Sequence, residues 1–351
     1  MGRQTMPETP VLEAIELTKV YHMPRKGSNS WRQQEFRAVD TVSLQLFAGT
    51  TAALVGQSGS GKSTLVRLLS RLERPTSGVI RVDGEVTDAR RGRSYRQYCE
   101  QVQIVLQDPY ASLNPGFRVG RSVRRPLEIH KIHSNRAERD AAVERLLEQV
   151  KLTPPEQFVS KFPHELSGGQ RQRVAIARSL AVSPRVLLAD EPVSMLDVSV
   201  KVEILRVLNE CRESMGLALL YVTHDIASAR WCADTISVMY AGQIVESGPS
   251  DEVTQRARHP YTQLLIRSTP DPAASHADGA SHGESRSAER AGPDREGCRF
   301  RSNCPSAMAR CATTEPPVVQ LSEDQWVRCW LYDSGPPAAT ATLSSDGDRR
   351  A

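Results

Sequence analysis

The stretch "GQSGSGKS" at residues 56–63 constrains the fold of this chain more than any other feature. It fits the pattern G-x-x-x-x-G-K-[ST]. It follows the apolar run "TAALVG" (51–56) and leads into "KSTLVRLLSRL" (62–72), whose leucines recur at helical spacing. A buried strand, a glycine-rich turn and a helix are the context in which this pattern forms a phosphate-binding P-loop. An ordinary Gly/Ser turn would not explain the Lys-Ser pair or the flanking elements.

The residue types of this loop suit a nucleotide and Mg²⁺. The three glycines let the backbone turn tightly, so that successive N–H groups can point at phosphate oxygens. The lysine adds a positive charge for the β- and γ-phosphates, the serine after it can ligate Mg²⁺, and the helix N-terminus favours an anion. The predicted nucleotide contacts in the loop are Gly56, Ser58, Gly59, Gly61, Lys62, Ser63 and Thr64.

Strand and helix patterns alternate along much of the chain. Strand-like runs occur at 11–21, 185–190 and 217–225, and amphipathic helical patterns at 136–150 and 200–214. This alternation predicts an α/β layered fold with a mainly parallel sheet. The pattern between about residues 110 and 180 is mostly helical, which predicts a helical subdomain inserted in the middle.

Two adjacent carboxylates stand at the end of a buried strand in "RVLLADEP" (185–192), where the first closes the strand. Asp190 can hold Mg²⁺ through water, and Glu191 can polarise the water that attacks the γ-phosphate. Taken alone, the pair is as readily explained as a solvated strand end. Beside a P-loop, the functional interpretation is favoured.

The stretch "LSGGQRQR" (166–173) offers a second phosphate-binding element. Ser167, Gly168, Gly169 and Gln170 provide a hydroxyl, exposed backbone N–H groups and the positive end of a helix that we expect to begin near Gln170. A capped helix start alone would explain the serine and little else.

Together these motifs resemble those of an ATP-binding cassette (ABC) ATPase. The P-loop, "LSGGQ", "LLADEP", "LD" (196–197) and "YVTHD" (221–225) occur in that family's order, and the similarity covers residues 11–265. It implies a P-loop NTPase cassette with a RecA-like core, an antiparallel β subdomain and the helical subdomain. It also implies that ATP is hydrolysed to ADP and phosphate.

The resemblance assigns roles to matching positions. Tyr21 is similar to the aromatic that stacks on adenine, and Gln107 to the glutamine that touches Mg²⁺ and senses the membrane partner. Asp197 resembles the aspartate of the loop that joins two cassettes, and His224 the switch histidine at the γ-phosphate. A single histidine after an apolar strand is more often structural, but its place after the Asp-Glu pair favours this role. Glu191 and His224 are thus the expected catalytic residues, and Mg²⁺ is expected at Ser63, Gln107 and Asp190.

The chain carries one P-loop and one "LSGGQ", and in the resembling family these two elements face different nucleotides. Each ATP is then held between two cassettes, so the resemblance implies a second ABC ATPase subunit, identical or related. Met195 stands where the family has a small residue in "SALD". We expect it to change packing at the dimer interface without loss of activity.

Three further stretches resemble the ATP-binding subunits of dipeptide/oligopeptide permeases: "QDPYASLNP" (107–115), "DEPVSMLDVSV" (190–200) and "HPYTQLL" (259–265). The resemblance implies peptide import with two transmembrane permease subunits and an extracytoplasmic solute-binding protein. The location would be peripheral, at the cytoplasmic face of the inner membrane. Importers of nickel or glutathione remain alternatives, as does a soluble ABC ATPase acting on DNA or ribosomes. An exporter cassette is disfavoured, because it is usually fused to its membrane helices or paired with a short chain.

Charge and hydrophobicity indicate which partners and which cellular location to expect. A net charge of +4 is too small to indicate nucleic-acid binding. No apolar run reaches the roughly 18 residues of a membrane-spanning helix, and the N-terminus lacks the apolar core of a secretory signal. We therefore expect a cytoplasmic chain in which structural disulfides do not form. Residues 271–296 have the composition of a polar linker and 334–351 that of a disordered tail.

Four cysteines lie close together near the end of the chain, in a small module expected over residues 297–333. Cys298, Cys304, Cys311 and Cys329 are separated by 5, 6 and 17 residues. These intervals fit neither common zinc modules nor simple ferredoxins. The module resembles the C-terminal extension of peptide-permease ATPases, some of which look able to hold a [4Fe–4S] cluster. Zn²⁺, or thiols that merely pack in the protein, remain alternatives.

Overall fold

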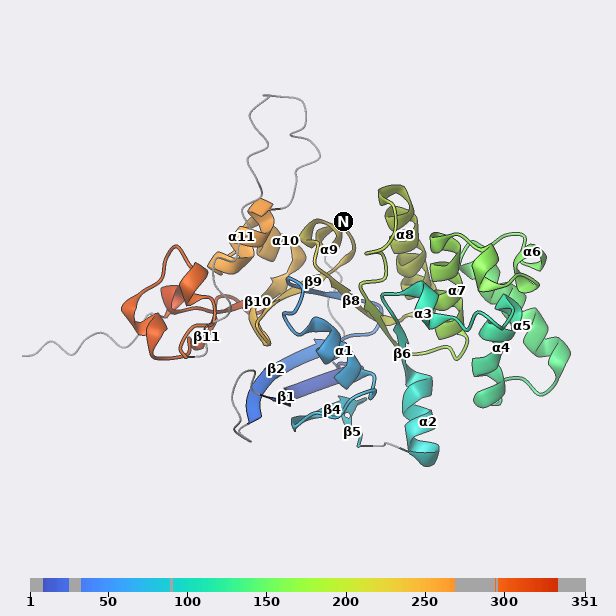
Figure 1. Ribbon diagram of the computed structural model, residues 1–351, viewed down its shortest axis with the longest axis horizontal. Coiled ribbons are helices and arrows are strands. Elements are labelled where there is room, and N and C mark those ends of the chain that lie inside the picture. The colour runs from blue at the N-terminus through green and yellow to red at the C-terminus, as the bar shows by residue number, and fades with distance from the viewer. Residues whose placement is uncertain (1–8, 25–32, 89–90, 269–293, 295, 334–351) are drawn as a thin grey trace, which may run out of the picture.

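The computed structural model describes residues 9–24, 33–88, 91–268, 294 and 296–333 (Figure 1). Almost all of the expected linker at 271–296, and the whole of the expected tail at 334–351, lie outside these residues. Within the described part of the chain, no helix is both long enough and apolar enough to cross a membrane.

An eight-stranded sheet forms the centre of the molecule. Its order is β11-β12-β10-β9-β3-β8-β7-β6, with parallel pairing from β9 to β6 and antiparallel pairing from β9 to β11. Every residue of β3, β7 and β8 is buried, as expected for parallel strands covered on both faces. The strands are β3 (Thr51–Val55), β6 (Val102–Val105), β7 (Val186–Asp190), β8 (Ala218–Thr223), β9 (Thr235–Tyr240), β10 (Gln243–Pro249), β11 (Val318–Gln320) and β12 (Trp326–Arg328).

A smaller antiparallel sheet packs beside the central one. It contains β1 (Leu12–Pro24), β2 (Gln33–Leu46), β4 (Ser77–Val82) and β5 (Glu85–Val86), in the order β2-β1-β4-β5. Helix α1 (Lys62–Leu69) contributes Leu65, Leu68 and Leu69 to the hydrophobic core between the two sheets. The predicted strand, P-loop and helix are confirmed, although α1 ends at Leu69 and not at residue 72.

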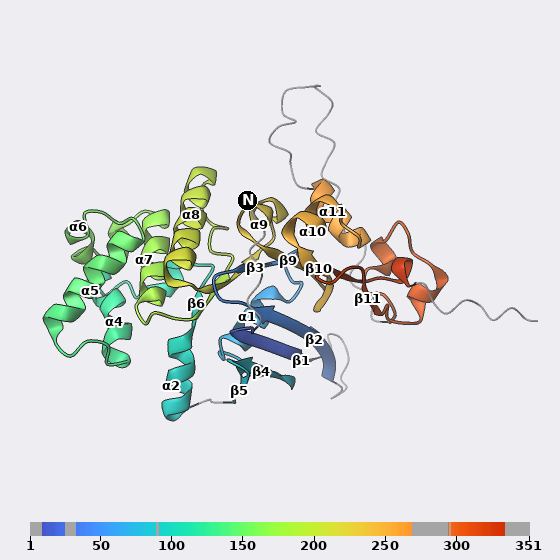
Figure 2. The same cartoon turned by 180° about the vertical axis from the view of Figure 1, so that it is seen from behind.

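The expected helical region lies at the β6 end of the central sheet (Figures 1 and 2). It contains α3 (Pro109–Ser112), α4 (Val119–Ile129), α5 (Arg136–Gln149), α6 (Glu156–Val159), η1 (Pro163–Glu165) and α7 (Gly168–Leu180). The other helices are α2 (Gly92–Gln101), α8 (Val198–Met215), α9 (Ile226–Cys232), α10 (Ser250–Gln255) and α11 (Pro260–Ser268).

The expected module at residues 297–333, here called the cysteine-bearing segment, packs against the cassette and extends its central sheet. Strand β12 pairs with β10, with Val327 opposite Glu246 and Trp326 opposite Ser247. Phe300 is 1% exposed and belongs to the main hydrophobic core. The 3₁₀ turns η2 (Arg301–Asn303), η3 (Ala309–Ala312) and η4 (Trp330–Tyr332) complete the segment. Its position opposite the helical region is clear in both views (Figures 1 and 2).

Candidate nucleotide-binding site

The loop between β3 and α1 is held in close contact with two neighbouring backbone segments. Gly61, at the start of α1, has φ +107°, and a Cβ there would lie 2.2 Å from the carbonyl oxygen of Ala38. A Cβ on Gly56 would lie 2.2 Å from the carbonyl oxygen of Met239. Only glycine fits at these two positions, so the sequence pattern has a direct steric cause.

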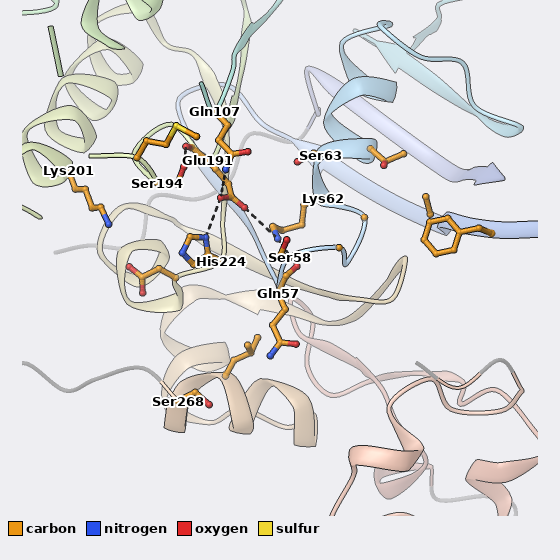
Figure 3. A pocket seen from close by; sticks show the side chains of 18 residues that line it. Gln57, Ser58, Lys62, Ser63, Gln107, Glu191, Ser194, Lys201, His224 and Ser268 are labelled. Carbon is orange, nitrogen blue, oxygen red and sulfur yellow. Dashed lines mark hydrogen bonds and ion pairs between the residues drawn. The ribbon is translucent and has the colours of Figure 1, made fainter. Parts of the chain in front are cut away.

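A cavity of about 1000 Å³ opens beside this loop (Figure 3). It is lined by most of the predicted residues of the loop and by the predicted residues that follow β6, β7 and β8: Ser58, Gly59, Gly61, Lys62, Ser63, Thr64, Gln107, Glu191 and His224. The sequence did not single out several further lining residues, among them Phe36, Gln57, Lys201, Leu265 and Ser268. Gln57 and Leu265 lie within the stretches "GQSGSGKS" and "HPYTQLL", whereas no motif marks the other three positions, which reach the cavity through the tertiary fold.

The Lys62 side chain is already directed at the loop. Its Nζ donates hydrogen bonds to the carbonyl oxygens of Gly56 (2.7 Å) and Gln57 (2.9 Å), and it lies 3.8 Å from Oε1 of Glu191. Burial lowers the pKa of this ammonium group, and the nearby carboxylates of Glu191 and Asp190 partly offset the effect. The cation is thus preorganised for a negatively charged ligand, with backbone carbonyls as partners.

Oxygen donors suited to Mg²⁺ meet at the start of α1 and the end of β7. The Ser63 hydroxyl donates to Oδ1 of Asp190 over 3.2 Å. Asp190 is 6% exposed, and burial raises the pKa of its carboxyl group. A buried carboxylate beside a hydroxyl is the hard oxygen donor set that Mg²⁺ binds, together with phosphate oxygens. Ser63 and Asp190 therefore fit the metal that an ABC ATPase requires.

Glu191 lies at the centre of the polar contacts in the cavity (Figure 3). Its Oε2 accepts a hydrogen bond from Nε2 of Gln107 (3.2 Å) and lies 3.3 Å from Nδ1 of His224. Its backbone adopts φ +44°, which is uncommon for a residue with a side chain, and its N–H donates to the carbonyl of Val222 over 3.0 Å. Gln107, His224 and the Lys62 ammonium thus surround one carboxylate, which faces the cavity and can orient a water molecule.

The "LSGGQ" segment forms the N-terminus of α7. Ser167 caps the helix: its Oγ accepts from the N–H of Gln170 (3.2 Å), and the Gln170 side chain accepts from the Ser167 N–H (3.1 Å). The helix therefore begins at Gly168, two residues before the expected start at Gln170, because the cap satisfies its first turn. Neither these residues nor Asp197 line the cavity of their own chain.

Tyr21 does not line the cavity. Its hydroxyl donates to the Glu73 carboxylate, and Nζ of Lys19 lies 5.0 Å from the centre of its ring. Its partner across the β1–β2 pair is Phe36, which is 44% exposed and lines the cavity. The sequence did not reveal this aromatic, because the register of a pair joined by a long insert is not readable from local pattern.

The four C-terminal cysteines lie near one another. Cys311 and Cys329 are buried, whereas Cys298 and Cys304 are half-buried, and none of the chain's cysteines, all of them described, forms a disulfide. Burial, and then the other three thiols, raise the pKa of Cys298 to about 11. Among the described residues, no three His, Cys, Asp or Glu side chains come close enough to hold one metal ion. The four cysteines share a neighbourhood, but the structure gives no support for the expected iron–sulfur cluster among its described residues.

Comparisons with known proteins match the chain to ATP-binding proteins of ABC transporters. The model of the ABC transporter family matches residues 39–194, and the model of the oligopeptide/dipeptide transporter C-terminal region matches residues 245–311. Over 336 residues the chain is 41% identical to the probable peptide ABC transporter ATP-binding protein y4tS of Sinorhizobium fredii, which covers 95% of this chain and 92% of that protein. It is 39% identical to the di/tripeptide transport ATP-binding protein DppF of Pseudomonas aeruginosa over 91% of this chain and 97% of that one.

A solved structure shows the same fold. The ATP-binding cassette MJ0796, in a dimeric post-hydrolysis state bound to ADP and Pi, superposes with a TM-score of 0.60 and 29% sequence identity. The match covers 68% of this chain and 98% of that one.

Proposed function

Because this chain belongs to the family of ABC transporter ATP-binding subunits, and is an ATPase, we propose that it energises peptide import through a membrane permease. The match that carries the proposal is the oligopeptide/dipeptide C-terminal region at residues 245–311. Relatives named for peptide transport, similar over most of the chain, support it further. We place the protein peripherally, at the cytoplasmic face of the inner membrane, with two permease subunits and an extracytoplasmic solute-binding protein as partners.

Hydrolysis is derived from the residues around the cavity. The P-loop N–H groups and Lys62 bind the phosphates, and Ser63, Asp190 and Gln107 would hold Mg²⁺, which neutralises phosphate charge when bound. The Glu191 carboxylate accepts a hydrogen bond from the attacking water and orients it. His224 and Gln107 hold that carboxylate in place through the contacts on Oε2.

The segment Ser167–Gln170 and Asp197 support assembly with a second cassette. The segment presents a capped helix N-terminus, a favourable place for phosphate, yet lies outside the cavity of its own chain. The similar cassette MJ0796 is dimeric in the structure with ADP and Pi. We therefore propose that this segment closes over the nucleotide of a partner subunit, either a second copy or a related chain.

The cargo is tested on the assembled transporter. ATP hydrolysis by the purified complex with its permease should rise when the solute-binding protein is added with a peptide. Stimulation by nickel or glutathione instead would redirect the proposal to the same machine with another cargo. Hydrolysis that no membrane partner affects, in a chain that follows ribosomes or DNA, would contradict the transport function itself.

Phe36 is the aromatic we propose to stack on adenine. Phe36→Ala should raise the KM for ATP roughly tenfold with little change in kcat, because base–aromatic stacking contributes about 1–3 kcal/mol. Tyr21→Ala is the competing variant, since the resemblance assigned the stacking role to Tyr21, which contacts Glu73 and does not line the cavity. If Tyr21→Ala raises KM and Phe36→Ala does not, the role belongs to Tyr21, as the family resemblance implied.

We propose that Cys298, Cys304, Cys311 and Cys329 hold a [4Fe–4S] cluster. Four cysteines are the ligand count that such a cluster needs, and the mutual effect of these thiols on the pKa of Cys298 supports their sharing one neighbourhood. Zn²⁺ takes the same number of thiolates, so metal analysis decides between the two.

The cluster proposal predicts brown protein when the chain is purified without oxygen. We expect about four iron and four sulfide per chain, absorbance in the visible range, and loss of all three in Cys311→Ser. The matched control is Cys99→Ser, a thiol on α2 outside the segment. Colourless protein that lacks both iron and zinc would show that the thiols only pack.

A further inference from the structure

Phe300, in the cysteine-bearing segment, completes a buried aromatic cluster. The centre of its ring lies 5.4 Å from that of Tyr261 at the start of α11 and 5.3 Å from that of Tyr240 at the end of β9. The two tyrosine rings are 4.6 Å apart. Both Phe300 and Tyr261 are within 1% of complete burial, so each ring fixes the position of the others.

Tyr261 connects this cluster to the nucleotide site. Its hydroxyl oxygen accepts a hydrogen bond from the backbone N–H of Gln57 over 3.0 Å. Gln57 is the second residue of the P-loop and lines the cavity, and its carbonyl oxygen accepts from Nζ of Lys62 over 2.9 Å. A continuous series of contacts therefore runs from Phe300 through Tyr261 and Gln57 to the phosphate-binding lysine.

The neighbouring Arg299 supports the same loop from a second direction. Its guanidinium donates to the carboxylate of Asp40 and to the carbonyl oxygen of Ala241. The Asp40 N–H donates to the carbonyl of Gly242 over 2.8 Å, and the Gly242 N–H donates to the carbonyl of Ser60, also over 2.8 Å. Arg299 and Phe300, which are consecutive in the cysteine-bearing segment, thus support the P-loop at two places. Phe300 acts near its beginning and Arg299 near its middle.

We propose that Tyr261 is a positioning residue for the P-loop and that Phe300 holds Tyr261 in place. The cysteine-bearing segment thereby sets the affinity of the site for nucleotide. The inference rests on the proposed ATP-binding function of this site and assigns a role to a segment that hydrolysis itself does not use. The pairing of β12 with β10 anchors the segment on the cassette. A change in the segment's packing therefore reaches the loop through the aromatic cluster.

The decisive variant is Tyr261→Phe, which keeps the ring and removes the hydroxyl that accepts from the Gln57 N–H. We expect the Kd for ATP of the full chain to rise roughly five- to tenfold, because a buried N–H is left without its partner. The kcat at saturating ATP should stay near that of the wild type. Amide hydrogen exchange of the peptide that contains Gln57 should become faster in the nucleotide-free protein. A residue that only stabilised the fold would speed exchange throughout the core and not selectively at Gln57.

The matched control is Tyr98→Phe. Tyr98 is also buried, and its hydroxyl donates to the carbonyl of Leu69 at the far end of α1. We expect this variant to lose stability without a change in ATP affinity or in exchange at Gln57.

Phe300→Leu tests the second half of the series. It should weaken ATP binding in the same direction as Tyr261→Phe, whereas Phe158→Leu, at a buried phenylalanine of the helical region, should not. If Phe300→Leu does not fold, Tyr261→Phe still decides the role of Tyr261.

Wild-type Kd and wild-type exchange at Gln57 in Tyr261→Phe would overturn the inference while the ATPase assignment stands. A wild-type chain that binds no ATP at all would overturn the proposed function as well. The two failures are therefore distinguishable in one series of measurements.

Discussion

Glu191→Gln should reduce steady-state ATP hydrolysis at least about a hundredfold while ATP binding is kept, because a positioned general base contributes about 10²–10⁴ to such rates. The amide has nearly the shape of the carboxylate and can still contact Gln107 and His224. It cannot accept a proton from the attacking water. With hydrolysis blocked and binding intact, the variant should remain in an ATP-bound dimer, which size-exclusion chromatography with light scattering would detect.

The control for Glu191→Gln is Glu144→Gln, the same chemical change on an exposed face of α5. It should hydrolyse ATP like the wild type and should not accumulate as a dimer. Near-normal hydrolysis by Glu191→Gln would show that the water is oriented by another group, and the assignment of Glu191 would be wrong.

Gly61→Ala should abolish ATP binding and destabilise the fold. The backbone at φ +107° is unfavourable for any residue with a Cβ, which costs at least about 1–2 kcal/mol. The added carbon would also lie 2.2 Å from the carbonyl oxygen of Ala38, a backbone atom that cannot move freely. The start of α1 must shift to relieve this contact, and Lys62 and Ser63 shift with it.

Gly49→Ala separates the effect of a positive φ from the effect of a steric clash. Gly49 also has a positive φ, +71°, but a Cβ there would meet nothing within 4 Å. We expect a modest loss of stability in urea denaturation and unchanged ATP binding by titration calorimetry. If Gly61→Ala binds ATP as tightly as Gly49→Ala, the close approach of the loop to Ala38 has no functional role.

The features predictable from sequence are those encoded locally. Strand β3, the P-loop and α1 follow one another within twenty residues, and the loop glycines are required by contacts of the backbone itself. The resemblance placed the carboxylates at the end of β7 and the histidine after β8 in one site, and neighbouring parallel strands do bring their carboxyl ends to one edge of the sheet. Each motif was therefore recognisable on its own, although the hydrogen bond of Ser63 to Asp190 joins residues 127 positions apart.

The features missed depend on tertiary pairing. Phe36 lines the cavity through the register of β1 with β2, and the contact of Tyr261 with Gln57 spans 204 positions. Strands β11 and β12 extend the central sheet because β12 pairs with the edge of β10. A strand of three residues is too short to show a periodic pattern in the sequence. Each of these required the three-dimensional arrangement of distant segments.

Peptide uptake into proteoliposomes tests the central claim most directly. The vesicles would hold the permease complex with this subunit and enclosed ATP, and the peptide-loaded solute-binding protein would be added outside. We predict ATP-dependent accumulation of labelled peptide with the wild-type subunit and none with Glu191→Gln. Accumulation that persists with Glu191→Gln, or active ATP hydrolysis by the wild-type complex without any peptide uptake, would contradict the account.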